Sequence, residues 1–167
     1  MLIRAEQPTD WAAVHAVNES AFETRAEADL VDALRQQAQT VVSLVAEHDG
    51  SVVGHIMFSP VSLSEHPGLK IMGLAPMAVT PRHQRNGIGS ALVRAGLEGC
   101  KQLGFGAVAV LGHPEYYPRF GFLPARRFGI GCEYDAPEEA FMVLELHPGF
   151  LHGASGIIKY HEAFRNV

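Results

Sequence analysis

The stretch Arg82–Leu92, RHQRNGIGSAL, places two glycines directly before a run of apolar residues with helical spacing. Glycine lets a backbone approach a ligand closely, and the first amides of a helix are unpaired donors at the positive end of its dipole. Basic and amide side chains precede the glycines and favour the same kind of ligand. The sequence therefore predicts an anion-binding loop at the start of a helix.

The spacing of these glycines excludes two common phosphate loops. A dinucleotide-binding GxGxxG motif would need a third glycine where Leu92 stands. A Walker loop needs GK[ST] after four spacer residues, and the chain contains no such segment. What remains is the pattern QxxGxG, formed by Gln84, Gly87 and Gly89 with Arg85 between them.

Length and composition predict one compact domain over residues 1–167. The 167 residues are 47% hydrophobic and 19% charged, which is ordinary for a globular protein with a sizeable core. The formal net charge of −5 and the lack of any basic run argue against a nucleic-acid partner. No apolar window reaches the length of a membrane span, so we expect no membrane partner.

Two cysteines, Cys100 and Cys132, are too few for a disulfide framework, which favours a cytoplasmic protein. The N-terminus lacks a basic segment followed by an apolar one, so we expect no export signal. Nine histidines occur without a Cys/His cluster or an HxxxH pair, so we expect no metal site.

Turn residues and apolar periodicity divide the chain into strands and helices. Asp49-Gly50 marks a hairpin, Pro60 and Pro67 mark a loop, and Pro76 interrupts a strand by removing a ladder donor. The stretch 153–167 is compatible with a strand or with a packed tail. The expected strands are Leu2–Ala5, Val41–Glu47, Val52–Phe58, Ile71–Thr80, Ala107–Leu111 and Phe141–Leu146. The expected helices start at a Thr9 cap, at a capping box of Thr24 and Glu27, and at Ile88.

The strand, glycine loop, helix and strand of Ile71–Leu111 resemble the acetyl-CoA-binding core of the GNAT superfamily of N-acetyltransferases. A second motif agrees, because HPEYYPRFGF at His113–Phe122 matches the family's FYxxxGF segment with Tyr117 at the tyrosine. The segment GLAPMAV before the loop most resembles the bacterial subgroup of YhbS-type predicted acetyltransferases. The resemblance covers about three quarters of the chain or more.

This resemblance implies an α+β fold in which a mixed, mostly antiparallel sheet splays apart between two parallel strands and is flanked by helices. It implies acetyl-CoA as cosubstrate, with the pantetheine arm held by the backbone of the interrupted strand. The residues expected to bind the cofactor are Met77, Ala78 and Val79 on that strand, and Gln84, Arg85, Asn86, Gly87, Ile88, Gly89 and Ser90 in the loop. Arg82 and His83 are expected to face solvent.

The resemblance also assigns Tyr117 as the catalytic residue that protonates the leaving CoA thiolate. Tyr116 would then face the opposite way and pack with Phe120 and Phe122 in the core. An alkyl amine has a pKa of about 10.4, so the reaction also needs a base. Many family members carry a carboxylate on the interrupted strand, but Ile71–Thr80 holds neither Asp nor Glu. Glu23, His55 and water are left as alternatives.

The function that explains both motifs is transfer of an acetyl group from acetyl-CoA to a primary amine by direct attack on the thioester. The acceptor is a small-molecule amine or a protein amine, and relatives in the family often form homodimers. A catalytically silent acetyl-CoA-binding module or sensor is the main alternative. A nucleotide-phosphate binder or small kinase ranks last, because the lysine and carboxylates of phosphoryl transfer are missing.

Overall fold

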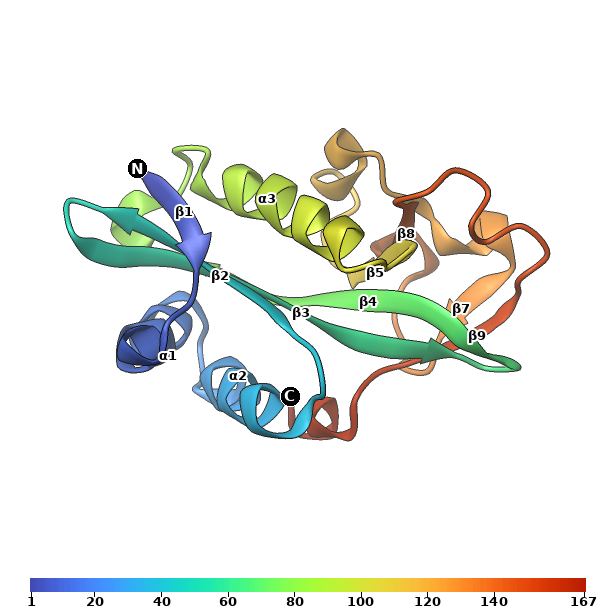
Figure 1. Ribbon diagram of the computed structural model, residues 1–167, viewed down its shortest axis with the longest axis horizontal. Helices are drawn as coiled ribbons and strands as arrows, with labels where there is room; N and C mark the ends of the chain where they lie inside the picture. The colour runs from blue at the N-terminus through green and yellow to red at the C-terminus, as the bar shows by residue number, and fades with distance from the viewer.

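The computed structural model describes residues 1–167 and consists of one nine-stranded sheet, three α-helices and several short 3₁₀ turns (Figure 1). The strands are β1 (Leu2–Ala5), β2 (Val42–His48), β3 (Ser51–Leu63), β4 (His66–Val79), β5 (Ala107–Leu111), β6 (Leu123–Pro124), β7 (Ile130–Cys132), β8 (Phe141–Glu145) and β9 (Gly156–Lys159). The helices are α1 (Trp11–Ala21), α2 (Ala26–Gln37) and α3 (Ile88–Gln102). The 3₁₀ turns are η1 (Pro8–Asp10), η2 (Pro81–His83), η3 (Tyr117–Phe120), η4 (Ala125–Phe128), η5 (Glu138–Ala140) and η6 (Glu162–Asn166).

The sheet is mixed and mostly antiparallel, as predicted. Its main path runs β1-β2-β3-β4-β5-β8-β6, and β9 pairs with both β3 and β7 off this path. Two neighbouring pairs are parallel, β4 with β5 and β7 with β9. None of the helices is long and apolar enough to cross a membrane.

The sheet opens between the parallel strands β4 and β5. Their pairing covers only Ile71–Leu74 opposite Ala107–Val110, after which β5 ends and β4 continues to Val79. The register between β3 and β4 shifts where the pairing of β4 with β5 ends. The shift lies between Ile56 and Phe58 on β3, opposite the part of β4 that contains Pro76. A bulge bends and twists a strand locally, so this irregularity turns the end of β4 away from β5.

The three helices bury both faces of the sheet, with α1 and α2 on one face and α3 on the other (Figure 1). Successive residues of a strand point to opposite faces. Accordingly Phe58 of β3 belongs to the core under α3, while its neighbour Met57 packs with Val14 of α1 and Leu34 of α2. All four of these side chains are fully buried.

The α3 helix lies unusually close to the sheet at Gly96. A Cβ atom at this position would lie 2.1 Å from Cε1 of Phe58, well inside contact distance. The helix can therefore pack here only with glycine, and its N-terminus is held above the end of β4.

Three local predictions about where elements begin and end are wrong. Pro60 and Pro67 lie inside β3 and β4 rather than in a loop, because the two strands form a hairpin that extends to Leu63 and His66. The β2 strand stops pairing at Phe58, so Pro60 lies where β3 has lost one neighbour and a missing donor is tolerated.

The two predicted helix caps also differ. Thr9 lies within η1, and the carboxylate of Asp10 accepts the hydrogen bond from the Gln7 amide at 2.7 Å. The hydroxyl of Thr24 accepts from the amide of Ala26 at 3.2 Å, two residues on, so the predicted capping box with Glu27 does not form. Glu27 is thereby free of the capping role.

The stretch 153–167, which the sequence left open, contains both a strand and a packed turn. The β9 strand pairs with β3 at Ser62 and Leu63. The η6 turn follows and packs against α2, with Phe164 beside the cluster of Leu30, Val31 and Leu34.

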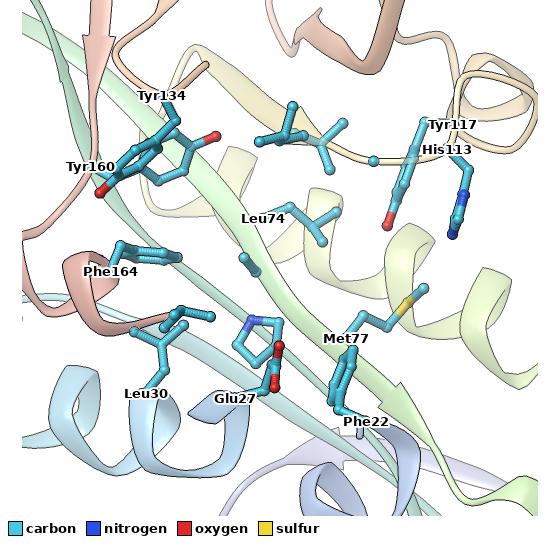
Figure 2. A pocket seen from close by; sticks show the side chains of 16 residues that line it. Phe22, Glu27, Leu30, Leu74, Met77, His113, Tyr117, Tyr134, Tyr160 and Phe164 are labelled. Carbon is cyan, nitrogen blue, oxygen red and sulfur yellow. The ribbon is translucent and has the colours of Figure 1, made fainter. Parts of the chain in front are cut away.

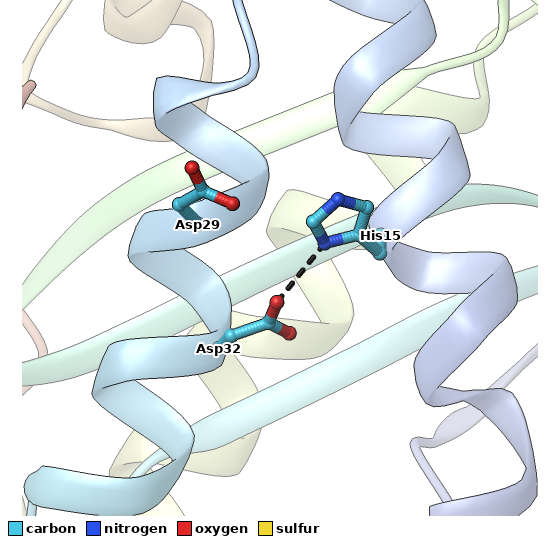
Figure 3. Close-up of side chains that lie close together, drawn as sticks. All are labelled: His15, Asp29 and Asp32. Carbon is cyan, nitrogen blue, oxygen red and sulfur yellow. Dashed lines mark hydrogen bonds and ion pairs between the residues drawn. The ribbon is translucent and has the colours of Figure 1, made fainter.

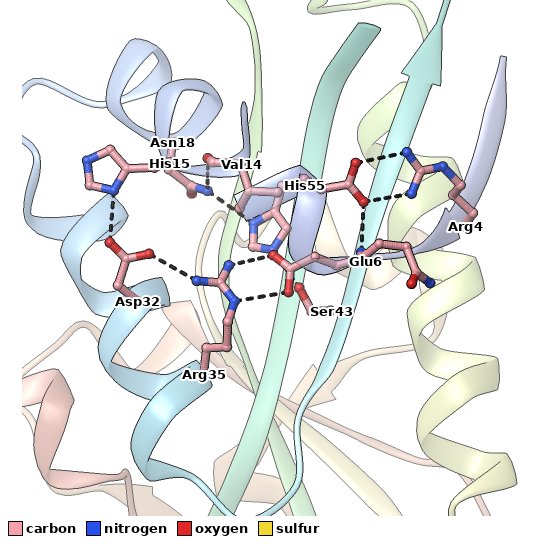
Figure 4. A network of polar contacts seen from close by, with 11 residues as sticks. Arg4, Glu6, Val14, His15, Asn18, Asp32, Arg35, Ser43 and His55 are labelled. Carbon is pink, nitrogen blue, oxygen red and sulfur yellow. Dashed lines mark hydrogen bonds and ion pairs between the residues drawn. The ribbon is translucent and has the colours of Figure 1, made fainter. Parts of the chain in front are cut away.

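A polar network fastens α1 and α2 to the sheet (Figure 4). The guanidinium of Arg35 in α2 binds Glu6 and Asp32. His55 of β3 is fully buried beneath it, with Nδ1 3.1 Å from the side-chain nitrogen of Asn18 and Nε2 2.9 Å from the hydroxyl of Ser43. The amide of Asn18 donates to Nδ1, so the proton of the neutral ring is on Nε2.

We expect the Gly96→Ala substitution to lower the free energy of unfolding by about 1–3 kcal/mol, because the added methyl overpacks the contact with Phe58. Gly99→Ala on the same helix is the matched control. Its Cβ would lie 3.5 Å from Val42, so the better helix propensity of alanine should leave stability unchanged or raise it by up to about 1 kcal/mol. Urea unfolding measures both, and equal stability of the two variants would contradict the close packing.

We also expect His55 to make the protein acid-sensitive. Burial and the charge of Arg35 lower the pKa of His55 from 6.5 to about 3. Below pH 6.5 the unfolded chain therefore binds a proton at His55, whereas the folded protein does not. Stability from this site is complete above pH 6.5 and is lost as the pH falls toward 3. Between pH 6.5 and 4.5 the free energy of unfolding should drop by about 2 kcal/mol through this residue.

The measurement is urea unfolding at several pH values for the wild type and for His55→Gln, which keeps hydrogen-bonding groups but does not titrate. The exposed His152→Gln serves as control. A wild-type pH profile parallel to that of His55→Gln would show that His55 carries no such linkage.

Candidate functional site

The predicted anion loop is built as its sequence indicates. Gly87 caps α3 in the left-handed conformation with φ +81°, and Arg85 also has a positive φ of +66°. The first hydrogen bond of the helix runs from the amide of Ala91 to the carbonyl of Gly87 at 3.1 Å. The amides of Ile88, Gly89 and Ser90 therefore precede the helical ladder and are open to a ligand.

A cavity of about 410 Å³ lies over this loop. Its lining residues come from the end of β4, the loop, the start of α3 and η3: Val79, His83, Gln84, Arg85, Gly87, Ile88, Gly89, Ser90, Tyr116 and Arg119. Met77 and Ala78 do not line this cavity, and Asn86 is exposed beside it. Arg119 was not predicted for the site, because it is distant from the loop in the sequence and only the folded structure brings it close.

Side-chain bonds tie the loop to the end of β4. The amide nitrogen of Gln84 donates to the carbonyl of Val79 at 2.9 Å, and His83 Nδ1 lies 2.9 Å from the hydroxyl of Thr80. Gln84 therefore acts in this structure as a link between loop and strand. Arg82 is exposed as predicted, whereas His83 is half-buried by its contact with Thr80.

The end of β4 presents backbone donors to the opening in the sheet. The amide of Thr80 donates to the carbonyl of Val53 in β3 at 2.9 Å. Because alternate residues of a strand point to the same side, the amides of Val79 and Met77 face away from β3. The β5 strand does not pair with this part of β4, so these two amides face the gap between the strands.

The two adjacent tyrosines of the second motif take different positions. Tyr117 is buried, with its ring 5.7 Å from that of Phe122. Burial, with a smaller contribution from Tyr116, raises the pKa of Tyr117 to about 12, so its phenol stays protonated at neutral pH.

The predicted position of Tyr116 in the core beside Phe122 is wrong. Its ring packs on Phe120 at 5.3 Å and its hydroxyl lies 3.0 Å from that of Ser90 in the loop. The segment forms a 3₁₀ turn, in which neighbouring residues are about a third of a turn apart rather than on opposite faces. The guanidinium of Arg119 stacks over Tyr116 at 4.4 Å from the ring centroid.

A second cavity of about 410 Å³ begins where β4 and β5 separate (Figure 2). One end is lined by Met77, Tyr117 and His113, and the other by Tyr134, Tyr160 and Phe164. Phe22, Glu27 and Leu30 form a third wall that comes from α2 and the segment before it. The remaining lining residues are Leu74, Ala75, Pro76, Val110, Leu111, Gly112 and Val167.

Neither side chain predicted as a base is placed to act as one. Glu23 is exposed and does not line the cavity. His55 is sealed in the core, and both of its ring nitrogens are engaged by Asn18 and Ser43. Its position on a strand between two covered faces makes it a structural histidine.

Sequence reasoning missed Glu27, whose carboxylate points into the cavity at the opening of the sheet (Figure 2). A signal for it exists. Glu27 is one turn before Leu30 and Val31, so it is a carboxylate on the apolar face of an amphipathic helix.

His15, Asp29 and Asp32 form a cluster of titratable side chains on α1 and α2 whose polar atoms lie within 4.8 Å of one another (Figure 3). His15 Nδ1 lies 3.0 Å from Asp32, which also binds Arg35 at 3.0 Å. The cluster lies outside both cavities; His15 joins α1 to Asp32 of α2, whereas Asp29 pairs with Arg25 at the start of α2.

Comparison with known proteins gives the family. Residues 10–122 match the acetyltransferase (GNAT) family. The chain is 39% identical over 165 residues to the uncharacterized N-acetyltransferase YhbS of Escherichia coli K12, with 98% of each chain covered. The chain belongs to the GNAT family of acetyltransferases.

Two solved structures of GNAT proteins carry the cofactor. The crystal structure of E. coli YhbS in complex with CoA matches with a TM-score of 0.92 at 38% identity, covering 98% of this chain and 91% of that one. A GNAT acetyltransferase from Brucella melitensis in complex with acetyl-CoA matches with a TM-score of 0.79 at 37% identity, covering 98% and 97%. The protein is therefore an N-acetyltransferase with acetyl-CoA as its cosubstrate.

We expect Gly89→Val to weaken CoA binding at least tenfold with little effect on the melting temperature. A Cβ at this position would lie 3.3 Å from the Tyr116 hydroxyl and 3.5 Å from Met77, so a branched side chain would fill the space in front of the loop amides. Gly99→Val, on the same helix but outside the cavity, is the control. Calorimetric titration with CoA measures both, and wild-type affinity in Gly89→Val would place the phosphates elsewhere.

Proposed function

We propose that the protein transfers the acetyl group of acetyl-CoA to a primary amine by direct attack of the amine on the thioester. One observation supports this proposal above the others: a single cavity joins the open edge of β4, the buried phenol of Tyr117 and a region walled by α2 and the C-terminal segment. Thioester, acid and acceptor can all be accommodated there without a second site.

The cofactor would run from the loop to this cavity. In the proposal the amides of Ile88, Gly89 and Ser90 bind the pyrophosphate at the positive end of α3. Arg85 and Arg119 line the cavity over the loop and supply positive charge. Asn86 and Gly87 shape the loop, and Gln84 holds it against the end of β4.

The pantetheine arm would then enter the gap between β4 and β5. The amides of Met77 and Val79 face this gap, and an extended arm can bond to them as an added strand would. Ala78 is buried between them and keeps the strand in register with His55. The thioester carbonyl would accept a hydrogen bond at this edge.

The chemical step consumes a neutral amine, because an ammonium has no lone pair. Its nitrogen forms a bond to the acetyl carbon, the bond from that carbon to the CoA sulfur breaks, and the sulfur leaves as a thiolate. We assign Tyr117 as the group that donates a proton to this sulfur, since its raised pKa keeps the phenol protonated. We assign water as the group that takes the proton from the nitrogen and returns one to Tyr117, so that the phenol is restored; neither Glu23 nor His55 lines the cavity.

Other parts of the proposal concern the whole molecule. We treat residues 1–167 as a single GNAT domain, which is supported by a sheet that includes strands from both ends of the chain. A cytoplasmic location is consistent with the two cysteines, Cys100 and Cys132, which form no disulfide. A homodimer and the choice between a small-molecule and a protein amine remain predictions.

A catalytically silent acetyl-CoA-binding module would share the loop and the open strand, but it would have no need of a buried phenol in the cavity. Turnover separates the two functions. We expect release of the CoA thiol from acetyl-CoA in the presence of a primary amine, whereas a silent module would bind the cofactor and release none.

We expect Tyr117→Phe to lower kcat at least tenfold while the Kd for acetyl-CoA and the melting temperature stay nearly unchanged. General acid assistance is typically worth about 10²- to 10⁴-fold, and removing the hydroxyl keeps the packing of the ring on Phe122. The assay follows release of the CoA thiol with a panel of primary amines.

Tyr116→Phe is the matched control for this experiment. It removes a hydroxyl that contacts Ser90 at the loop rather than the reacting atoms, so kcat should change less than about threefold. Equal kcat values for Tyr117→Phe and the wild type would exclude Tyr117 from the mechanism.

A further inference from the structure

No side chain of the protein pairs with the carboxylate of Glu27. Its carboxylate makes no ion pair or hydrogen bond, and Oε1 is enclosed without a partner. The other two acids of α2 are paired, Asp29 with Arg25 at 3.4 Å and Asp32 with Arg35 at 3.0 Å. An unpaired carboxylate in a partly dry place lowers stability, so this arrangement points to a cation that comes from outside.

The walls around Glu27 favour an organic cation. Twelve of the sixteen residues that line the cavity are hydrophobic, and none is lysine or arginine. Tyr134, Tyr160 and Phe164 form a continuous aromatic wall, with ring centroids 5.9 Å and 5.0 Å apart along the series (Figure 2). Aromatic faces attract cations, and they also bury apolar groups well.

The same wall contains two further polar atoms without a partner, the hydroxyls of Tyr134 and Tyr160. Enclosed polar groups are almost always hydrogen-bonded in folded proteins, so two unpaired hydroxyls set this wall apart from an ordinary core. They lie at the end of the cavity away from Tyr117 (Figure 2).

We propose that Glu27 binds the ammonium group of the acceptor as it enters, before water removes the proton that frees its lone pair, and that the acceptor is a compact primary monoamine with an aromatic or alkyl body. This inference rests on the proposed acetyl transfer and names its substrate class. Glu27 is the only acidic side chain of the lining and neutralises a single charge, and a second ammonium would be buried unpaired among apolar side chains. Polyamines and amino sugars are therefore poor acceptors.

The size of the cavity points to a small free amine. Its volume of about 410 Å³ also has to hold the acetyl group and the end of the pantetheine arm. Phe164 lies at the end of the cavity away from Tyr117, and the aromatic wall there disfavours the bulk of a protein chain (Figure 2).

The test combines amine binding with turnover. Benzylamine, 2-phenylethylamine, spermidine, kanamycin and a lysine-containing peptide are titrated into the protein saturated with CoA. The same amines are assayed for CoA-thiol release from acetyl-CoA. Both measurements are made on the wild type, on Glu27→Gln, and on Glu23→Gln as a matched control that loses an exposed carboxylate on the same segment.

We expect the two arylalkylamines to bind at least tenfold more tightly than the other three compounds. Glu27→Gln should weaken their binding and raise their KM at least tenfold, while kcat changes less than about threefold, because the charge acts on binding. Glu23→Gln should match the wild type. Without ligand, the melting temperature of Glu27→Gln should stay close to that of the wild type, since the carboxylate has no side-chain partner to lose.

Several outcomes would overturn the proposal: unchanged amine affinity in Glu27→Gln, absence of binding by either arylalkylamine, preference for spermidine, kanamycin or the peptide, or a fall in the melting temperature of Glu27→Gln. Glu27-dependent binding without thiol release would support the amine site and refute acetyl transfer. Thiol release that does not depend on Glu27 would support acetyl transfer and refute the amine site at Glu27.

Discussion

The separation of β4 from β5 after Leu74 is the constraint on which the rest of the structure depends. Pairing between the two strands stops there, and the irregularity opposite Phe58 carries the end of β4 away. An opening in the middle of a sheet exposes backbone donors that would otherwise be paired, which costs free energy unless a ligand bonds to them. Met77 and Val79 supply such donors here.

The opening can serve as a binding site only because other elements are held at fixed positions beside it. Gly96 lets α3 lie against Phe58, and this contact puts the amides at the helix start beside the end of β4. Gln84 then bonds the loop to Val79. On the opposite face, Arg35 binds Glu6 and so holds α2 to the segment after β1, while His55 joins α1 to β2 through Asn18 and Ser43.

Features encoded within a short stretch of sequence could be predicted, and those made by distant segments could not. The loop at Gly87, the interrupted strand at Pro76 and the motif at Tyr117 each follow from residues that are close in the chain. Arg119 and Glu27 reach the two cavities only through tertiary packing. The same holds for the wall of Tyr134, Tyr160 and Phe164, since hydropathy patterns do not reveal which distant strand β9 joins.

His55 and Glu27 show how burial decides what a titratable side chain does. His55 has a hydrogen-bond partner for each ring nitrogen, and burial keeps it neutral. It therefore stabilises the fold, and neither nitrogen is available to accept a proton from a substrate. Glu27 has no partner and faces a cavity that opens to the reacting end of the cofactor site. Side chains that lower stability in the free protein are those whose interactions are completed by a ligand, which makes Glu27 the residue that connects the fold to the choice of acceptor.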